Sequence, residues 1–132
     1  MNGHVPVRLV LRPESFCIHR LPPDRKIGLD AFGAAPWYSV TRTNDELSII
    51  APEDFDPGPG DRQSGWRCLQ IAETLAFDMV GVIAGIARVL AAANISIFTI
   101  STYNTDHVFV RTADVETAVG ALRAVGHVVS QG

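Results

Sequence analysis

The stretch that decides the fold is residues 81–101, GVIAGIARVLAAANISIFTIS. In its first part, apolar side chains recur at three- and four-residue spacing, which predicts a helix over residues 81–93 with one apolar face. They are Val82, Ile83, Ile86, Val89, Leu90 and Ala93. Asn94 suits the left-handed conformation that ends many helices. The β-branched and aromatic residues 95–101 then predict a strand.

The segments that follow and precede this stretch extend the pattern. Residues 66–71 alternate apolar and polar side chains and predict a strand before the helix. Residues 103–106 have the composition of a turn, so residues 107–111 predict the second strand of a hairpin. A second helix follows over residues 115–122, Gly126 ends it, and residues 127–129 predict a last strand. The order β-α-β-β-α-β is that of a ferredoxin-like α+β fold.

The N-terminal half has less helix. A stretch rich in Pro and Gly, residues 52–65, predicts a linker, so we expect an N-terminal lobe over residues 1–60 and a C-terminal domain over residues 61–132. The segments that predict strands in the lobe are residues 5–11, 16–21, 37–43 and 46–51, and residues 24–32 predict a short helical turn. Residues 39–50 align without a gap with residues 99–110, with Asn44 on Asn104. This weak repeat predicts that the lobe is a smaller, degenerate copy of the C-terminal domain.

Composition and charge exclude several function classes. The chain of 132 residues has a formal net charge of −3 and scattered Lys and Arg residues, so nucleic acid is not an expected partner. The longest apolar stretch, residues 79–93, is too short and too interrupted to span a membrane. Cys17 and Cys68 lie far apart in strand-like runs, so we expect buried thiols in a reducing compartment, the cytoplasm. The four histidines have no metal-ligand spacing, and no cofactor motif is present.

Several short motifs match a known family. They are Phe77-Asp78-Met79-Val80-Gly81 at the start of the helix, residues 90–97 (LAAANISI) at its end, residues 100–106 (ISTYNTD) and residues 65–69 (GWRCL). With these motifs, the chain resembles the ACT-domain family, and within it a group of short bacterial tandem-ACT proteins. It is also similar to the regulatory region of aspartate kinases and to the cytosolic arginine sensor of animals. The resemblance implies an ACT domain in the C-terminal half, with sensory or allosteric binding of amino acids at subunit or domain interfaces. ACT lobes pair side by side and sheet edges need cover, so we also expect a homodimer.

The start of the first helix is one half of the candidate site. The backbone N–H groups of Gly81, Val82 and Ile83 can hold a carboxylate, because the first N–H groups of a helix have no partner within it. Gly81 lets a ligand approach the backbone closely, and Asp78 can face the ligand's ammonium group. An ordinary helix start, with Asp78 as a cap and Gly81 for a tight entry, explains both residues equally well.

The hairpin after the helix is the other half. Ser101, Thr102, Thr105 and Asp106 supply hydroxyl groups and an acid, which is what a zwitterion needs, although turn chemistry alone also explains them. The corresponding hairpin of the N-terminal lobe offers a similar set, open to the same two interpretations. This set, which the family resemblance also marks, is Thr41, Thr43, Glu46 and Ser48.

The sequence therefore predicts a non-catalytic regulatory module that binds an amino acid or a similar small zwitterion, with no metal and no cofactor. No nucleophile, base and orienting group can be assembled from it. Two alternatives remain open. One is a pure interaction or dimerisation module with a degenerate site. The other is a small enzyme that uses Asp78, Asp106 and His107, which would require these groups to converge on one cleft.

Overall fold

A computed structural model describes residues 6–73 and 81–132 of the chain. The chain divides into two compact units. The first comprises Met1–Pro13 and Trp66–Gly132, and the second comprises Glu14–Gly65. The N-terminal residues thus belong with the C-terminal part of the chain. The domain boundary at residue 60 that was expected from the sequence would separate these two segments, and it stays a prediction.

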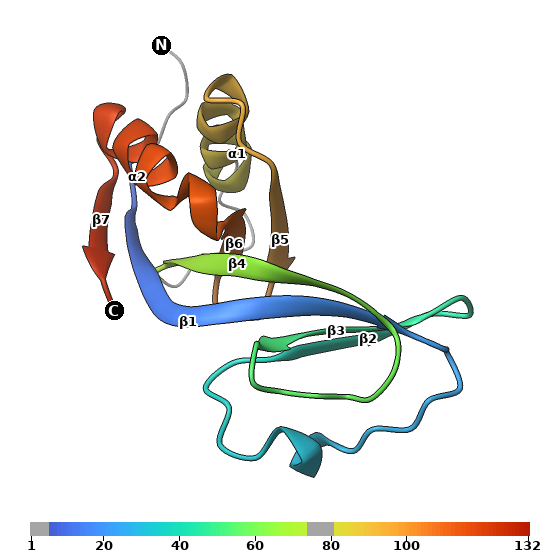
Figure 1. The fold of residues 1–132 in the computed structure, drawn as a ribbon. Helices are drawn as coiled ribbons and strands as arrows, with labels where there is room; N and C mark the ends of the chain where they lie inside the picture. The colour runs from blue at the N-terminus through green and yellow to red at the C-terminus, as the bar shows by residue number, and fades with distance from the viewer. Residues whose placement is uncertain (1–5, 74–80) are drawn as a thin grey trace. The chain divides into compact units, whose positions relative to one another are not determined.

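The first unit has the expected order of elements. The strands and helices are β4 (Asp61–Ile71), α1 (Val82–Ala92), β5 (Ile97–Ser101), β6 (Asp106–Arg111), α2 (Val115–Ala124) and β7 (Val128–Gln131), with the short 3₁₀ helix η2 (Thr112–Asp114) before α2. β5 and β6 are antiparallel to each other, and so are β4 and β6. The α+β fold with an antiparallel sheet and two helices is therefore confirmed (Figure 1).

One strand of this sheet comes from an unexpected place. The first residues of β1 (Arg8–Leu21) pair in parallel with β7, from Arg8 opposite Val128 to Leu11 opposite Gln131. β1 also neighbours β4, so the sheet order in the first unit is β7-β1-β4-β6-β5. Local sequence patterns do not show which distant segments pair, and a simple β-α-β-β-α-β reading leaves this added strand out.

The core of the first unit lies between the sheet and its two helices. α1 buries Val82, Ile86 and Leu90, and α2 buries Ala118 and Leu122. The spacing of four residues places each set on one helix face. These side chains meet Leu69 and Ile71 of β4, Val108 and Val110 of β6, and Leu9 and Leu11 of β1. Burial of each large apolar side chain contributes about 1.5–3 kcal/mol to folding.

Both helices of the first unit end in the same way. Asn94 has a φ of 61° after α1, and Gly126 has a φ of 101° after α2. The N–H of Ile95 donates to the carbonyl of Leu90 at 3.0 Å, and the N–H of His127 donates to that of Leu122 at 3.1 Å. A left-handed residue followed by this backward bond satisfies carbonyls that the helix leaves open. The expected stops at Asn94 and Gly126 are confirmed.

The second unit is built from strands. It contains most of β1, β2 (Ser39–Arg42), β3 (Leu47–Pro52) and the first residues of β4, in the order β2-β3-β1-β4. Its helical segment is a single 3₁₀ turn, η1 (Leu29–Phe32), which confirms the short helical turn expected there. Within Glu14–Gly65, all of which the structure describes, there is no α-helix. The lobe expected to be a smaller, degenerate copy of the C-terminal domain thus lacks α-helices like those of that domain, and its descent from an ACT domain stays a prediction.

Two segments of the N-terminal half that were expected to lie outside strands belong, in whole or in part, to strands instead. β1 runs through Pro13, because this residue falls between the ladder to β7, which ends at Leu11, and the ladder to β3, which begins at Phe16. No hydrogen bond of either ladder needs the N–H that proline lacks. The expected linker is also too long, since β4 already begins at Asp61.

Candidate ligand-binding site

The site is built around the start of α1. Gly81 precedes the helix with φ 90° and ψ −2°, a left-handed conformation that glycine adopts at little cost. A Cβ added to Gly81 would meet no atom of the described residues within 4 Å. None of the described residues in the first turn of α1 is acidic, so no side chain of that turn neutralises the positive end of the helix dipole. Space, N–H donors and positive potential thus occur together at this point.

Val82 and Ile83 contribute their backbone to this arrangement. The side chain of Val82 is buried in the core of the first unit, and that of Ile83 packs against the same core. Their N–H groups belong to the first turn, which has no acceptors within the helix, and the ladder of α1 starts with Gly85 donating to the Gly81 carbonyl at 2.8 Å. Asp78, the predicted partner of an ammonium group, lies outside the described residues.

The hairpin of β5 and β6 brings Ser101 and Asp106 together. The two residues are direct cross-strand partners, and the Ser101 hydroxyl donates to Oδ1 of Asp106 at 2.5 Å. Asp106 lies two residues before Val108, whose side chain packs in the core beneath the helices. Side chains alternate along a strand, so Asp106 and Ser101 lie on the helix-bearing face of the sheet. This is the face on which α1 begins.

Thr105 ties the turn of this hairpin to the end of β4. Its side chain is buried, and its hydroxyl donates to the carbonyl of Ile71 at 3.0 Å. The last residue of β4 therefore lies beside the hairpin turn. The arrow of β5, which leads into this turn, points to the same end of the sheet at which α1 begins (Figure 1). Thr105 has a structural role here, and its contact with a ligand stays a prediction.

Thr102 belongs to the turn itself. Its N–H and its hydroxyl both donate to the carbonyl of Thr105, at 2.9 and 3.1 Å. The two residues between them, Tyr103 and Asn104, form the exposed tip, and Tyr103 is 82% exposed. Turn chemistry thus accounts for Thr102, as the alternative interpretation expected. Its side chain is nevertheless exposed at the same end of the sheet as Ser101.

His107, the residue after Asp106, has its side chain on the opposite face of the sheet. His107 is buried, its Nδ1 lies 3.3 Å from the carbonyl oxygen of Ile100, and burial lowers the pKa of its imidazole. Adjacent residues of a strand present their side chains to opposite faces, so Asp106 and His107 do not converge on one cleft. The geometry therefore does not support an acid–base pair of these two residues.

The hairpin of β2 and β3 differs in register from the alignment that suggested a repeat. The N–H of Thr43 donates to the carbonyl of Glu46, so its tip is Asn44 and Asp45. The tip of the other hairpin is Tyr103 and Asn104, which makes Thr43 the equivalent of Thr102. The gap-free alignment of Asn44 with Asn104 is thus wrong by one residue, because it was anchored on a tip residue rather than on the bonded pair. Thr41 lies opposite Ser48, the cross-strand hydroxyl pair that was expected.

One pair of residues beside the site was missed by sequence reasoning. Glu73 follows β4, and its carboxylate accepts hydrogen bonds from the backbone N–H of Arg8 and from its Nε, the latter at 2.9 Å. The hydrogen bond from the Arg8 side chain lowers the pKa of Glu73. This pair holds the first residue of β1 against the second residue after β4. It could only be found by knowing that β1 is a neighbour of β4.

Comparisons with known proteins fit this geometry. A family model described as ACT domain matches residues 61–124. Protein Atu0741 of Agobacterium tumefaciens is 30% identical in sequence, with a TM-score of 0.87 over 97% of this chain and 95% of that one. Residues 61–124 thus form an ACT domain. The resemblance seen in residues 65–69 and 100–106 is therefore confirmed.

Two further proteins that the chain resembles are a regulatory subunit and a sensor. The regulatory subunit of aspartate kinase from Thermus thermophilus has the same fold, with a TM-score of 0.66 at 12% identity over 89% of this chain and 97% of that one. The cytosolic arginine sensor for mTORC1 subunit 1 of Rattus norvegicus is 28% identical over 116 residues, 82% of this chain and 35% of the sensor. The chain thus spans about a third of the length of the curated relatives it matches. It is an ACT module that resembles amino-acid sensors.

Among residues 6–73 and 81–132, no helix is long and apolar enough to cross a membrane. Cys17 and Cys68 are both buried thiols, as expected from the strand-like segments around them.

Proposed function

We propose that this protein is a non-catalytic regulatory module that binds a free amino acid at the start of α1. The observation that carries the proposal is the conformation of Gly81, which is left-handed, with no described atom within 4 Å of the position that a Cβ would take. The alternative of a pure interaction module gives no reason for this arrangement.

The chemistry of the ligand follows from the groups around that space. The N–H groups of Gly81, Val82 and Ile83 suit an α-carboxylate, which gains from both hydrogen bonds and the helix dipole. Asp106 suits the ammonium group, and Ser101 already holds one of its oxygens at 2.5 Å. An acid fixed in this way loses little rotational freedom when a cation arrives. The ligand's side chain remains free to set specificity.

A second copy of the chain completes the proposal. β5 pairs with β6 and with no other strand among the described residues, so one edge of its backbone has no hydrogen-bond partner in the first unit. Open edges of this kind are covered in stable proteins. We propose a cytoplasmic homodimer in which these edges pair, with no metal or cofactor.

The experiment that tests the function is a thermal-shift screen against the twenty amino acids. A ligand that binds only the folded state stabilises it by about 2.7 kcal/mol at a hundred times its Kd. We expect one amino acid, or a few of similar side chain, to raise the Tm in a dose-dependent way. The matched controls are the decarboxylated amine and the deaminated acid of each hit, and neither should act. No shift with any amino acid, or equal shifts with a control, would contradict the proposal.

A further inference from the structure

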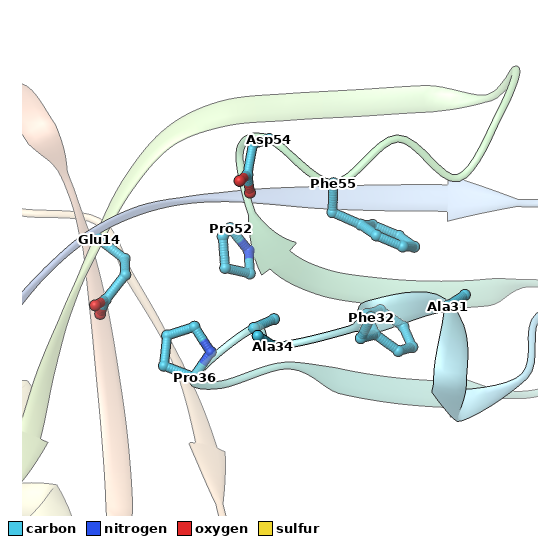
Figure 2. A pocket seen from close by; sticks show the side chains of 9 residues that line it. Glu14, Ala31, Phe32, Ala34, Pro36, Pro52, Asp54 and Phe55 are labelled. Atoms are coloured by element: carbon cyan, nitrogen blue, oxygen red, sulfur yellow. The ribbon is translucent and has the colours of Figure 1, made fainter.

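The second unit contains a pocket that the proposed function does not use. It has a volume of 460 Å³ and opens to the surface (Figure 2). One wall comes from η1 and the residues after it, through Phe32 and Pro36. The other comes from the end of β3 and the residues after it, through Pro52 and Phe55. A volume of this size is in the range that accommodates small organic ligands.

The apolar wall of the pocket is held rigidly. The ring of Phe32 stacks on that of Phe55 with centroids 4.5 Å apart, and on that of Tyr38 with centroids 3.9 Å apart. Phe32 is 5% exposed and lies in the core of the second unit with Leu21 and Leu47. Rings stacked in this way bury a large area and fix each other's orientation. The pocket is therefore preformed rather than created by movement of loose side chains.

The pocket also carries negative charge. Two of its lining residues, Glu14 and Asp54, are acids, and none is basic. Neither carboxylate makes a hydrogen bond or an ion pair with any other residue that the structure describes. The neighbouring Glu53 is different, since its carboxylate accepts the N–H of Gly65 at 2.7 Å. The chain thus ties one acid of this segment into the fold and leaves the next one at the pocket.

The positions of these groups suggest what can bind. Figure 2 shows the rings of Phe32 and Phe55 at one end of the pocket, and Glu14 and Pro36 at the other, with Asp54 and Pro52 between them. We propose that this pocket binds a small organic cation, a primary ammonium or a guanidinium group on an apolar body about the size of an aromatic ring. The apolar body packs on the ring wall, and the cation lies by the carboxylates. An anion is repelled by the same carboxylates.

This site is distinct from the one proposed at α1 and can be tested separately, because its ligand needs no carboxylate. The experiment is an NMR titration of the labelled protein with phenethylammonium chloride. The neutral control is 2-phenylethanol and the anionic control is 3-phenylpropionate. We expect saturable shifts at the amides of Ala31, Ala34 and Ala35, with the ammonium compound binding roughly fivefold or more tightly than the alcohol. Equal binding of the alcohol, or no saturable shift at these three amides, would overturn the proposal.

A pair of double variants tests the role of the acids. Glu14→Gln with Asp54→Asn keeps the size of both side chains and removes both charges. Asp24→Asn with Asp45→Asn removes two exposed charges of the second unit that do not line the pocket. We expect the first variant to bind phenethylammonium roughly threefold to tenfold more weakly, and the second to bind as the parent does. Equal weakening in both variants would mean that only net charge matters, and would overturn the proposal as well. The comparison of three ligands on the parent protein stands even if a variant does not fold.

Discussion

Gly81 and Gly28 both stand immediately before the first helix of their unit, and they differ in every property that a ligand would use. Gly81 is left-handed, with no described atom within 4 Å of where its Cβ would be, whereas Gly28 is extended, with φ −81°. A Cβ on Gly28 would lie 2.7 Å from Oδ1 of Asp30, because that carboxylate folds back over the helix start. The N-terminus of η1 thus has an anion of its own chain, and that of α1 has none among the described residues of its first turn.

The two hairpins, in contrast, are nearly alike. Each has a two-residue tip, and in each a threonine, Thr43 or Thr102, donates its N–H across the turn. The difference between the units therefore lies in their helix starts. The polar residues of a hairpin turn therefore do not by themselves distinguish a lobe that binds a ligand from one that is structural.

The largest expected effect concerns stability, where we predict that the two units do not differ. Leu90→Ala in the first unit and Ile49→Ala in the second each remove a fully buried side chain, and should each lower the free energy of unfolding by about 2–5 kcal/mol. β1 and β4 contribute residues to both units, so we expect one shared unfolding transition in urea. Val128→Ala, at a 57% exposed site, is the control and should change stability little. Two separate transitions would break the picture of a single cooperative fold.

The next prediction separates the two hairpins by ligand affinity. Asp106→Asn should weaken binding of the amino acid found in the screen by about 1.5–3 kcal/mol, because a hydrogen bond to a charged group is lost. Glu46→Gln changes the acid of the other hairpin and should leave affinity unchanged. Isothermal titration calorimetry measures both. If Glu46→Gln has the larger effect, the ligand sits in the other lobe.

A third prediction compares the two turns by their hydrogen bonds. Thr105→Val leaves the carbonyl of Ile71 without its buried donor and should cost about 1–3 kcal/mol of stability. Thr43→Val removes an exposed hydroxyl that accepts the N–H groups of Asp45 and Glu46, and water can replace it, so we expect about 0.5 kcal/mol or less. Urea unfolding of the two variants gives both values. Equal costs would show that the bond to Ile71 is not the anchor of the hairpin.

The last of these comparisons concerns the dependence of stability on pH. Burial lowers the pKa of His107 in the first unit and of His19 in the second, and for His19 the nearby Arg62 lowers it further while Asp56 opposes this. Below about pH 6.5 the unfolded chain takes up protons that the folded chain excludes, so stability should fall as pH is lowered, by at most about 1.4 kcal/mol per pH unit for each histidine. His19→Asn should flatten this dependence in urea unfolding between pH 7 and pH 5. An unchanged pH dependence of stability in that variant would show that His19 does not contribute to it.

Much of the first unit could be predicted from its sequence because its signals are local. The periodic apolar residues of α1 and the left-handed stops at Asn94 and Gly126 depend only on neighbouring residues. The insertion of β1 between β4 and β7 and the passage of β1 through Pro13 depend on pairing between distant segments, and no local pattern reports that. The same holds for the shifted register of the β2–β3 hairpin.

In the candidate site, too, local features could be predicted from the sequence and features that depend on distant segments could not. The need for glycine at position 81 could be anticipated from the helix start, and its φ of 90° bears this out. The burial of Thr105 against Ile71 could not, because it depends on which strand end meets the turn. The pocket of the second unit could not be predicted either, because Glu14, Phe32 and Asp54 lie in three separate segments that carry no shared motif.

The most direct test of the central claim compares Gly81→Val with Gly126→Val. Both glycines are left-handed, with φ 90° and 101°, and among the residues that the structure describes a Cβ at either would meet nothing within 4 Å. Both variants should therefore lose a similar amount of stability, about 1–2 kcal/mol from backbone strain. Calorimetric titration with the amino acid found in the screen should show no binding to Gly81→Val, because its side chain fills the space that the carboxylate needs, and parental binding to Gly126→Val. Parental affinity in Gly81→Val, or an equal loss in both variants, would contradict a ligand site at the start of α1.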